Sequence, residues 1–157
     1  MDAPWLNERE MRAWRGYARM QVLLSAHLHR TLLRETGLSL PDYEVLVHLS
    51  EASEGCLRPF QLSNALQWEK SRLSHHLTRM EARGLVTRRE CPTDARGALV
   101  VLTPAGRAAI EAAAPTHVAD VRESFIDVLT SVQLDTLAEI SDAVLTRLSA
   151  DGSEDRE

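Results

Sequence analysis

The sequence is poor in cysteine: it holds only Cys56 and Cys91, whose spacing is not that of a metal site. Two cysteines are too few for a disulfide framework, so reduced thiols are expected. No apolar run approaches the ~18 residues that a membrane-spanning helix needs, and the polar N-terminus MDAPWLNERE lacks the hydrophobic segment of a signal peptide. These absences argue against a secreted or membrane protein, and the expected location is the cytoplasm.

Signals of catalysis are missing as well. There is no nucleotide-binding loop, no nucleophile motif and no pair of carboxylates in a recognisable catalytic setting. The adjacent His75 and His76 would point about 100° apart on a helix, which does not suit a shared metal ion. We therefore expect no catalytic residue, no metal and no other cofactor, and an enzyme is the least favoured class of function.

Charge is distributed unevenly along the 157 residues. The net charge of −5 argues weakly against a nucleic-acid partner. However, residues 58–107 hold nine basic and four acidic side chains, or +5, while the rest of the chain carries −10. A basic middle between acidic ends is typical of a protein that contacts a polyanion with one region. Chance clustering on a solvated surface explains the charge equally well.

Apolar residues recur at helical spacing along most of the chain, which predicts a mainly α fold. Helices are expected near 4–36, 40–52 and 69–83, with a short one that starts at Pro59. Gly37 and Gly84 are expected to end the helices before them. Ser39 and Asp42 have the spacing of a capping box at the start of the second helix.

The period changes after Gly84. Two short β-prone runs, 85–89 and 98–102, flank the segment 91–97, whose proline and glycine predict a hairpin with a long tip. This hairpin is the small antiparallel β part of the predicted fold. Cys56 lies just before the third helix, where a short strand could pair with the hairpin.

Helical periodicity then returns. Thr103 and Pro104 have the pattern of an N-cap followed by proline in the first turn. The helix that they open is expected to reach about Leu129, with a kink or break at Pro115. Thr130 and Gln133 have the spacing of a second capping pattern at the start of a final helix. The charged tail 150–157 is expected to be disordered.

The helix predicted over 69–83 has two unlike faces. At about 100° per residue, Leu73, Leu77 and Met80 form one narrow stripe. A helix that buries this stripe exposes small polar and cationic side chains, as a helix that enters a major groove must. The alternative is an ordinary amphipathic helix with a wet polar face. The groove-facing candidates are Ser71, Arg72, His75, Thr78 and Arg79.

The hairpin that follows favours the groove interpretation. Arg96 lies in the predicted tip, from which an extended arm could reach an adjacent minor groove. Asp94, two residues earlier, can brace its guanidinium. A short Asp-x-Arg-Gly match is weak alone, but it gains weight directly after a helix-turn-helix.

Several segments together resemble the MarR family of transcriptional regulators. The run Leu38–Leu46 is similar to the start of that family's second helix, and Ser71–Ser74 with Glu81–Val86 and Arg88 to its recognition helix and first wing strand. Asp94–Gly97 and Leu102–Gly106 match its wing tip and the start of the next helix. The resemblance spans about residues 10–148 in the right order. One departure from the family pattern is Trp68-Glu69, at positions where small polar residues are common. Because an acidic side chain there would repel phosphate unless it caps the helix, Glu69 is not assigned to DNA.

The resemblance implies a winged helix-turn-helix with N- and C-terminal dimerisation helices. The expected regions are 1–37 for the first dimerisation helix, 38–103 for the DNA-binding region, and 104–149 for the C-terminal dimerisation helices. All belong to one compact domain. The implied partners are a palindromic double-stranded DNA operator and a second copy of the chain. The implied DNA-binding residues are Ser71, Arg72, Ser74, His75, Thr78, Arg79, Arg88, Asp94 and Arg96.

Two modes of regulation stay open. Members of the family commonly bind small lipophilic or aromatic effectors between their DNA-binding and dimerisation regions. Residues that could line such a pocket are Trp14, Tyr17, His27, Tyr43 and His48, although aromatic residues at helical spacing are usually core. Alternatively, Cys56 and Cys91 could approach one another and make the protein redox-responsive.

The main rival from another class is a helical interaction module that dimerises and binds protein without DNA. The charge distribution and the position of Arg96 oppose it. The family default is repression. The sequence thus predicts a ligand-responsive repressor.

Overall fold

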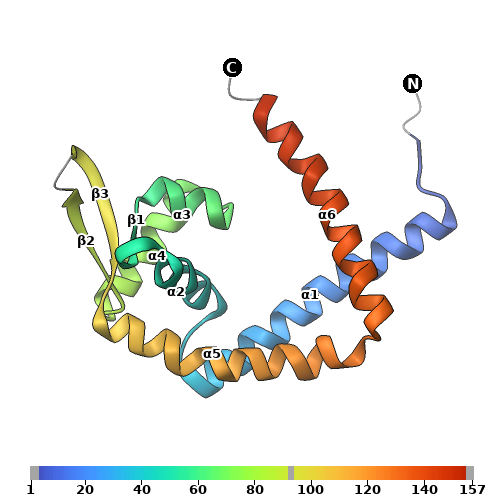
Figure 1. Cartoon of the computed structure of the whole chain (residues 1–157), viewed down its shortest axis with the longest axis horizontal. Helices are drawn as coiled ribbons and strands as arrows, with labels where there is room; N and C mark the ends of the chain where they lie inside the picture. Colours follow the sequence, from blue (N-terminus) through green and yellow to red (C-terminus); the bar gives the residue numbers. More distant parts are fainter. Residues whose placement is uncertain (1–3, 92–93, 155–157) are drawn as a thin grey trace. The chain divides into compact units, whose positions relative to one another are not determined.

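The structure, a computed structural model, describes residues 4–91 and 94–154. Its helices and strands follow the order that the sequence predicts, and the fold is mainly α with a three-stranded antiparallel sheet (Figure 1). The elements are α1 (Glu8–Thr36), α2 (Leu40–Glu51), η1 (Ser53–Gly55), β1 (Cys56–Leu57), α3 (Pro59–Leu66), α4 (Lys70–Ala82), β2 (Val86–Cys91), β3 (Asp94–Leu102), α5 (Pro104–Ser124), η2 (Ile126–Val128) and α6 (Ser131–Glu154).

The chain divides into two compact units, 1–118 and 119–157. The division falls inside α5. The first unit holds the whole sheet and α1 to α4, and the second holds the end of α5 and α6. Among residues 4–91 and 94–154, no helix is both long and apolar enough to cross a lipid bilayer.

Side-chain caps set the ends of the first helices. Asn7 and Glu10 form a reciprocal capping box at the start of α1, so the helix begins at Glu8 rather than near Pro4. Gly37 ends α1 with a φ of 75°, a left-handed conformation that glycine adopts without strain. The predicted capping box of Ser39 and Asp42 is present at the start of α2.

The end of α4 leads directly into the sheet. The Leu85 amide donates to the Met80 carbonyl at 3.1 Å, and the Gly84 amide donates to the Glu81 carbonyl at 2.9 Å. This pair of bonds is a Schellman motif, which requires the left-handed φ of 75° at Gly84. Because Leu85 and Met80 are both buried, the motif fixes the direction in which β2 leaves α4.

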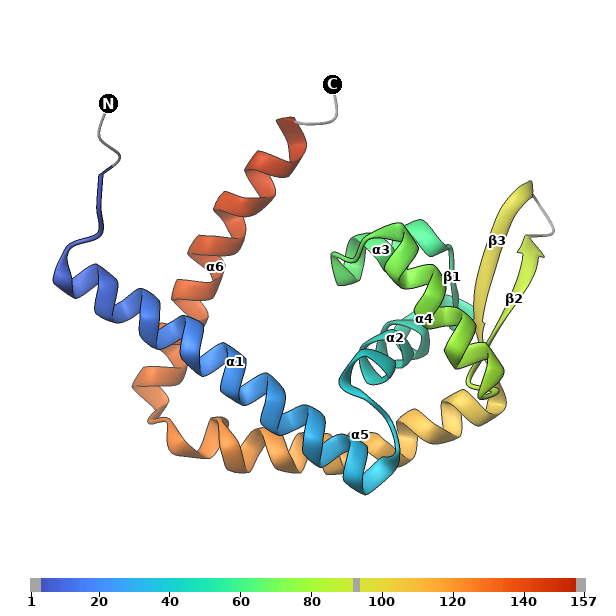
Figure 2. The same cartoon turned by 180° about the vertical axis from the view of Figure 1, so that it is seen from behind.

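The sheet has the strand order β1-β3-β2, and both pairings are antiparallel. β2 and β3 extend from the helices as a hairpin (Figure 2). The prediction of a long tip over 91–97 was wrong, because β2 continues to Cys91 and β3 starts at Asp94, opposite it. The register shifts after Glu90, which pairs with Ala98, so an irregularity rather than a loop takes up the extra residues.

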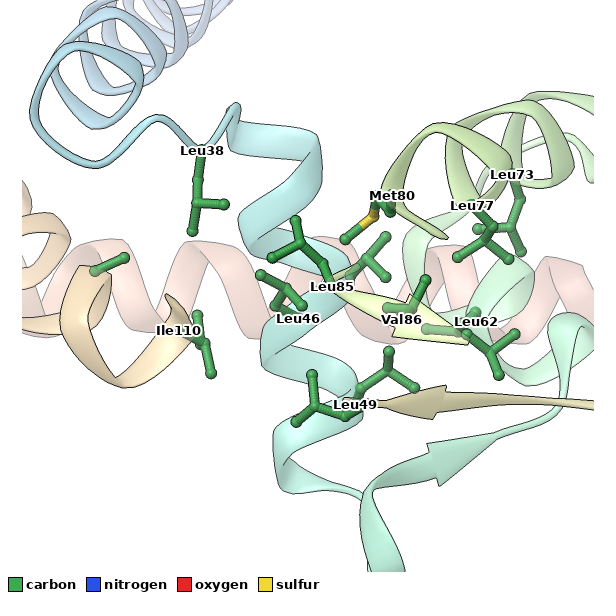
Figure 3. Packing of buried hydrophobic residues seen from close by; sticks show 14 of the residues in the cluster. Leu38, Leu46, Leu49, Leu62, Leu73, Leu77, Met80, Leu85, Val86 and Ile110 are labelled. Atoms are coloured by element: carbon green, nitrogen blue, oxygen red, sulfur yellow. The ribbon is translucent and has the colours of Figure 1, made fainter. Parts of the chain in front are cut away.

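One hydrophobic core joins the elements of the first unit (Figure 3). Leu73, Leu77 and Met80, the stripe predicted on α4, are at most 1% exposed. They pack with apolar residues of α2, α3, the sheet and the start of α5. The other members of the core are Leu32, Leu38, Val45, Leu46, Leu49, Leu62, Trp68, Leu85, Val86, Val100, Leu102, Ile110 and Ala113.

The start of α5 packs against the junction of α4 and β2. Thr103 caps the helix as predicted, because its Oγ1 accepts from the Gly106 amide at 2.9 Å. The same hydroxyl donates toward the carbonyl oxygens of Gly84 and Leu85, which lie 2.6 and 2.9 Å away. A Cβ at Gly106 would lie 2.0 Å from the Leu85 oxygen, so only glycine permits this approach.

The C-terminal helices differ from the prediction at their ends. α5 continues through Pro115 without a break, although proline leaves one carbonyl without its helical partner, and ends at Ser124 rather than near Leu129. Thr130 and Gln133 form the expected reciprocal caps at the start of the last helix. α6 runs to Glu154, five residues past the predicted boundary at 149, and residues 155–157 lie outside the described part.

Candidate DNA interface

The exposed face of α4 carries every side chain that the helical pattern assigned to a groove. Leu73, His76, Leu77 and Met80 are the buried residues of the helix. The remaining side chains face solvent because the buried stripe is narrow. The exposed predicted residues are Ser71, Arg72, Ser74, His75, Thr78 and Arg79.

A buried tryptophan supports the start of this face. Trp68 follows the turn at Gln67, which has a φ of 54° and joins α3 to α4. The guanidinium carbon of Arg72 lies 4.1 Å from the centre of the Trp68 ring, at the distance of a cation–π contact. Trp68 therefore gives Arg72 a preferred position at the start of α4. Glu69 occupies the N-cap position without a side-chain cap bond.

Arg88 ties the wing to the recognition helix. Its Nη2 donates to the Ser74 carbonyl oxygen at 2.6 Å, and its backbone amide donates to the Glu81 carboxylate at 2.8 Å. The Thr78 hydroxyl also donates to the Ser74 carbonyl, at 3.0 Å. Arg88 thus holds β2 against α4 through the backbone of Ser74, whose side chain stays exposed.

A buried carboxylate joins the start of α2 to the end of α4. Asp42 is 2% exposed, and its Oδ2 accepts from the Nη1 of Arg83 at 2.7 Å. The Nη2 of Arg83 donates to the Gly37 carbonyl at 3.2 Å, so the same guanidinium also reaches the end of α1. Burial by itself would raise the pKa of Asp42, but the close contact with His76 and the hydrogen bonds from Arg83 and the Ser39 amide outweigh it and hold the pKa well below its usual range.

His76 continues this network to the exposed face. Its Nε2 lies 3.0 Å from the Asp42 Oδ1, and its Nδ1 lies 3.1 Å from the Nη2 of Arg79. The Nε2 contact is close but poorly aligned for a hydrogen bond, so its attraction is mainly electrostatic. The imidazole also packs edge-on against Trp68, with ring centres 5.4 Å apart.

The sequence reasoning missed Asp42, His76 and Arg83 as a group. Asp42 was predicted only as a helix cap and Arg83 only as the end of a helix. His76 does follow Leu73 at a spacing of three, the spacing of a residue on the same face, which was an available signal for burial. Its partner 34 positions earlier on α2 has no signature in a single sequence.

The wing residues can be placed only by their backbone. Asp94 and Arg96 lie in β3, within the irregular part of the pairing, rather than in an open tip. The side chains of Asp94 and Arg96 lie outside the part of the structure that is described.

The five candidate effector residues do not form one cluster within the first unit. Trp14 and Tyr17 are both exposed on α1, with ring centres 6.0 Å apart. α2 starts beside His29, where the Leu40 amide meets the His29 Nδ1 at 3.2 Å. Tyr17 is therefore ~18 Å along α1 from that junction.

Tyr43, His48 and His27 occupy different positions. Tyr43 is partly buried against the core, and its ring centre lies 4.4 Å from that of His117. Burial, together with the carboxylate of Glu51, raises the pKa of Tyr43 and keeps its phenol neutral. His48 is half-buried in the last turn of α2, and His27 is exposed on α1.

The two cysteines are far apart. Cys56 pairs with Val101, which also pairs with Thr87, and Cys91 is the last residue of β2. The cysteine backbones are therefore separated by ~13 Å along the strands and ~10 Å across them. A disulfide needs Cα atoms within ~7 Å. The expectation that these thiols approach within one chain is contradicted by the strand register.

Comparison with known proteins agrees with this geometry. Residues 36–97 match the model of the MarR family. The chain is 31% identical over 105 residues to the multiple antibiotic resistance protein MarR of Salmonella typhimurium, covering 67% of this chain and 72% of that protein. The chain belongs to the MarR family.

Solved structures of Streptomyces coelicolor regulators resemble the whole chain. AbsC, a MarR-family transcriptional regulator, is 39% identical with a TM-score of 0.88, over 94% of this chain and 99% of that one. Sco3205, solved in complex with DNA, is 38% identical with a TM-score of 0.87, over 92% and 94%. The protein is thus a winged-helix transcriptional regulator that binds DNA, and not an enzyme.

Proposed function

We propose that this MarR-family protein is a repressor that binds a palindromic operator as a homodimer in the cytoplasm. α4 lies in the major groove, and the β2–β3 wing lies over the neighbouring minor groove. The observation that carries the proposal is the polar, cationic face of α4, which is fully exposed while the opposite face is buried and braced by Trp68 and Arg88. Such a helix can enter a groove without giving up core contacts.

Within this arrangement, the two arginines of the face have the reach to read bases. Arg72 and Arg79 are both exposed on α4. A guanidinium pairs with the O6 and N7 of guanine through two parallel hydrogen bonds. Ser71, His75 and Thr78 lie on the same face and contact phosphates or bases. Asp94 and Arg96 remain proposed wing contacts, with Arg96 entering the minor groove.

The dimer is proposed from exposed apolar side chains at both ends of the chain. α1 exposes Trp14, Tyr17 and Leu23, and α6 exposes Ile140, Val144 and Leu148 at helical spacing. Each of these side chains is at least half exposed. Exposed apolar surface of this kind is typical of a subunit contact. A second copy of the chain also supplies the second recognition helix, which a palindrome requires ~34–36 Å from the first.

The dimer has its own test. Val144→Asp is expected to convert the dimer to a monomer in sedimentation velocity and to abolish tight operator binding. Thr146→Asp places the same charge on a polar, exposed position on the opposite side of α6 and is expected to leave the dimer intact. A wild-type protein that sediments as a monomer at micromolar concentration would rule out the proposed dimer.

We also propose that the protein responds to a small lipophilic or aromatic effector. Tyr43 is the most suitable of the candidate residues, because it lies at the edge of the core beside His117 and presents a neutral phenol. The test is a thermal shift with salicylate as a probe. A higher melting temperature in wild type but not in Tyr43→Phe supports a site at Tyr43, and equal shifts exclude one.

DNA binding is tested with a duplex selected from a random pool by the purified protein. Arg79→Ala or Arg72→Ala is expected to cost about 1–3 kcal/mol at a base contact, or roughly five- to 150-fold in Kd by fluorescence anisotropy. Arg12→Ala removes the same charge from the exposed surface of α1 and should leave Kd unchanged. If all three variants bind as wild type does, α4 does not face DNA.

A further inference from the structure

A chain of polar contacts leads from the buried start of α2 to the exposed face of α4. It begins at Asp42, which is fixed by Arg83 at 2.7 Å and by the Ser39 amide at 3.0 Å. His76 follows at 3.0 Å from Asp42, and Arg79 at 3.1 Å from His76. Only Arg79 at the end of this chain is exposed on the face assigned to DNA.

The direction of the hydrogen bonds can be worked out. A guanidinium has donors only, so the Nδ1 of His76 must accept from Arg79. The neutral imidazole then carries its proton on Nε2, the nitrogen that faces the Asp42 carboxylate. An ionised Asp42 accepts only, and therefore favours this tautomer over the one with the proton on Nδ1. The latter would place an N–H against the guanidinium and break the contact.

We propose that His76 is a positioning residue that holds Arg79 in the orientation in which it reads DNA, and that Asp42 fixes the imidazole tautomer on which this depends. The proposal rests on the proposed contact between Arg79 and DNA. A long exposed arginine side chain loses rotamer freedom when it binds. Because Arg79 contacts the buried ring of His76, part of this loss of rotamer freedom already occurs when the protein folds. The guanidinium group is therefore aligned before DNA binds.

A purely structural role for His76 makes a different prediction. The ring fills space beside Trp68 and partners a buried acid, so its loss would lower stability whatever happens to Arg79. Two substitutions of His76 distinguish the positioning role from a purely structural one, because the amide side chain of each replaces one of the two ring nitrogens. Asn at position 76 places an amide oxygen near the Nδ1 position and keeps an acceptor for Arg79. Gln places an amide nitrogen near the Nε2 position and keeps a donor for Asp42.

The experiment measures operator affinity and stability for both variants, with the selected duplex and the full chain. His76→Asn is expected to bind within about twofold of wild type, and His76→Gln about fivefold more weakly, the effect of losing one hydrogen bond. Stability to urea should rank in the opposite order, with His76→Gln the more stable, since it retains the contact with the buried carboxylate. Equal affinities, or weaker binding by His76→Asn, would overturn the positioning role.

Arg79→Ala is the control that distinguishes failure of the positioning role of His76 from failure of the proposed contact between Arg79 and DNA. In that background His76→Asn and His76→Gln should bind equally, because no guanidinium remains to be oriented. If Arg79→Ala alone binds as wild type does, the assignment of Arg79 to DNA fails. If Arg79→Ala weakens binding but the two amide variants differ as much in its background as without it, only the positioning role fails.

The tautomer has an independent spectroscopic test. In the ¹H–¹⁵N spectrum of the histidine-labelled protein near neutral pH, His76 is expected to show the pattern of a ring protonated on Nε2 alone. Asp42→Asn, whose amide can donate to Nε2, should shift the ring toward the other tautomer and weaken operator binding about as much as His76→Gln. A wild-type ring with its proton on Nδ1 would contradict the proposal.

Discussion

Arg88 and Ser74 are joined by a hydrogen bond of 2.6 Å from the Arg88 Nη2 to the Ser74 carbonyl oxygen, which fastens the first wing strand to the middle of the recognition helix. The wing and the helix do not move independently while this bond is made. If α4 and the wing enter two grooves as proposed, this fixed relation aligns both elements before DNA binds.

This bond predicts a difference between neighbouring arginines. Arg88→Ala should lower the free energy of unfolding by about 1–2 kcal/mol, because it removes a charge-assisted hydrogen bond of a half-buried side chain. Arg89→Ala removes the same charge from an exposed position of the same strand, and its effect should stay within ~0.5 kcal/mol. Urea unfolding followed by circular dichroism measures both. Equal losses would show that the Arg88 bond contributes nothing.

Gly106 gives a prediction about the junction of α5 with the DNA-binding region. Gly106→Ala should destabilise the protein by about 2–4 kcal/mol, because a Cβ there would lie 2.0 Å from the Leu85 carbonyl oxygen and force the backbones apart. Gly16→Ala is the matched control. Gly16 lies within α1 with nothing within 4 Å of an added Cβ, so this change should stabilise the helix by about 0.5–1 kcal/mol. The same sign for both changes in calorimetry would refute the packing argument.

The local signals in the sequence were sufficient for most of the fold. Caps, glycines and helical periodicity are properties of short segments, so Gly37, the Ser39–Asp42 box and the Thr130–Gln133 box were found in the positions predicted for them. Strand ends depend instead on a partner strand. The hairpin is longer than its β-prone runs because Glu90 pairs with Ala98 across the sheet despite its polar character.

In the candidate site too, the sequence predicted the local features and missed the contacts between distant residues. The exposed face of α4 followed from the spacing of three apolar residues. The contacts that orient this face did not, because Asp42 and Arg83 are 41 positions apart and Arg88 meets Ser74 across 14. A single sequence carries no trace of such pairs. The sequence therefore predicted Arg88 as a DNA contact without any signal of its bond to α4.

Asp42 predicts a particular acid sensitivity. Its pKa is lowered in the folded state, so its contribution to stability is complete above the ordinary value of 3.8 and is lost as the pH falls below that value toward the folded pKa. Wild type should therefore lose stability below about pH 4 more steeply than Asp42→Asn. At pH 7, the variant should be less stable by about 3–5 kcal/mol, the effect of breaking a buried pair. Parallel curves of unfolding free energy against pH would contradict the assigned ionisation.

The strand register predicts the behaviour of the thiols. Mild oxidation with diamide should produce no disulfide between Cys56 and Cys91 of one chain, because the sheet holds their backbones too far apart. Non-reducing peptide mapping by mass spectrometry detects such a link directly. If it forms in the folded protein in high yield, the register at this end of the sheet is wrong. Loss of DNA binding on oxidation that Cys91→Ser prevents would instead indicate a link between chains or a modified thiol.

The most direct measurement is the sequence of the DNA that the purified protein selects from a random duplex pool. The account predicts an enriched palindrome whose half-sites lie about one duplex turn apart, ~10 base pairs from centre to centre. It also predicts that Arg79→Ala relaxes the preference at one position of each half-site and leaves the remainder of the motif unchanged. A pool without enrichment, or one enriched in a motif without two-fold symmetry, would contradict recognition by a pair of α4 helices.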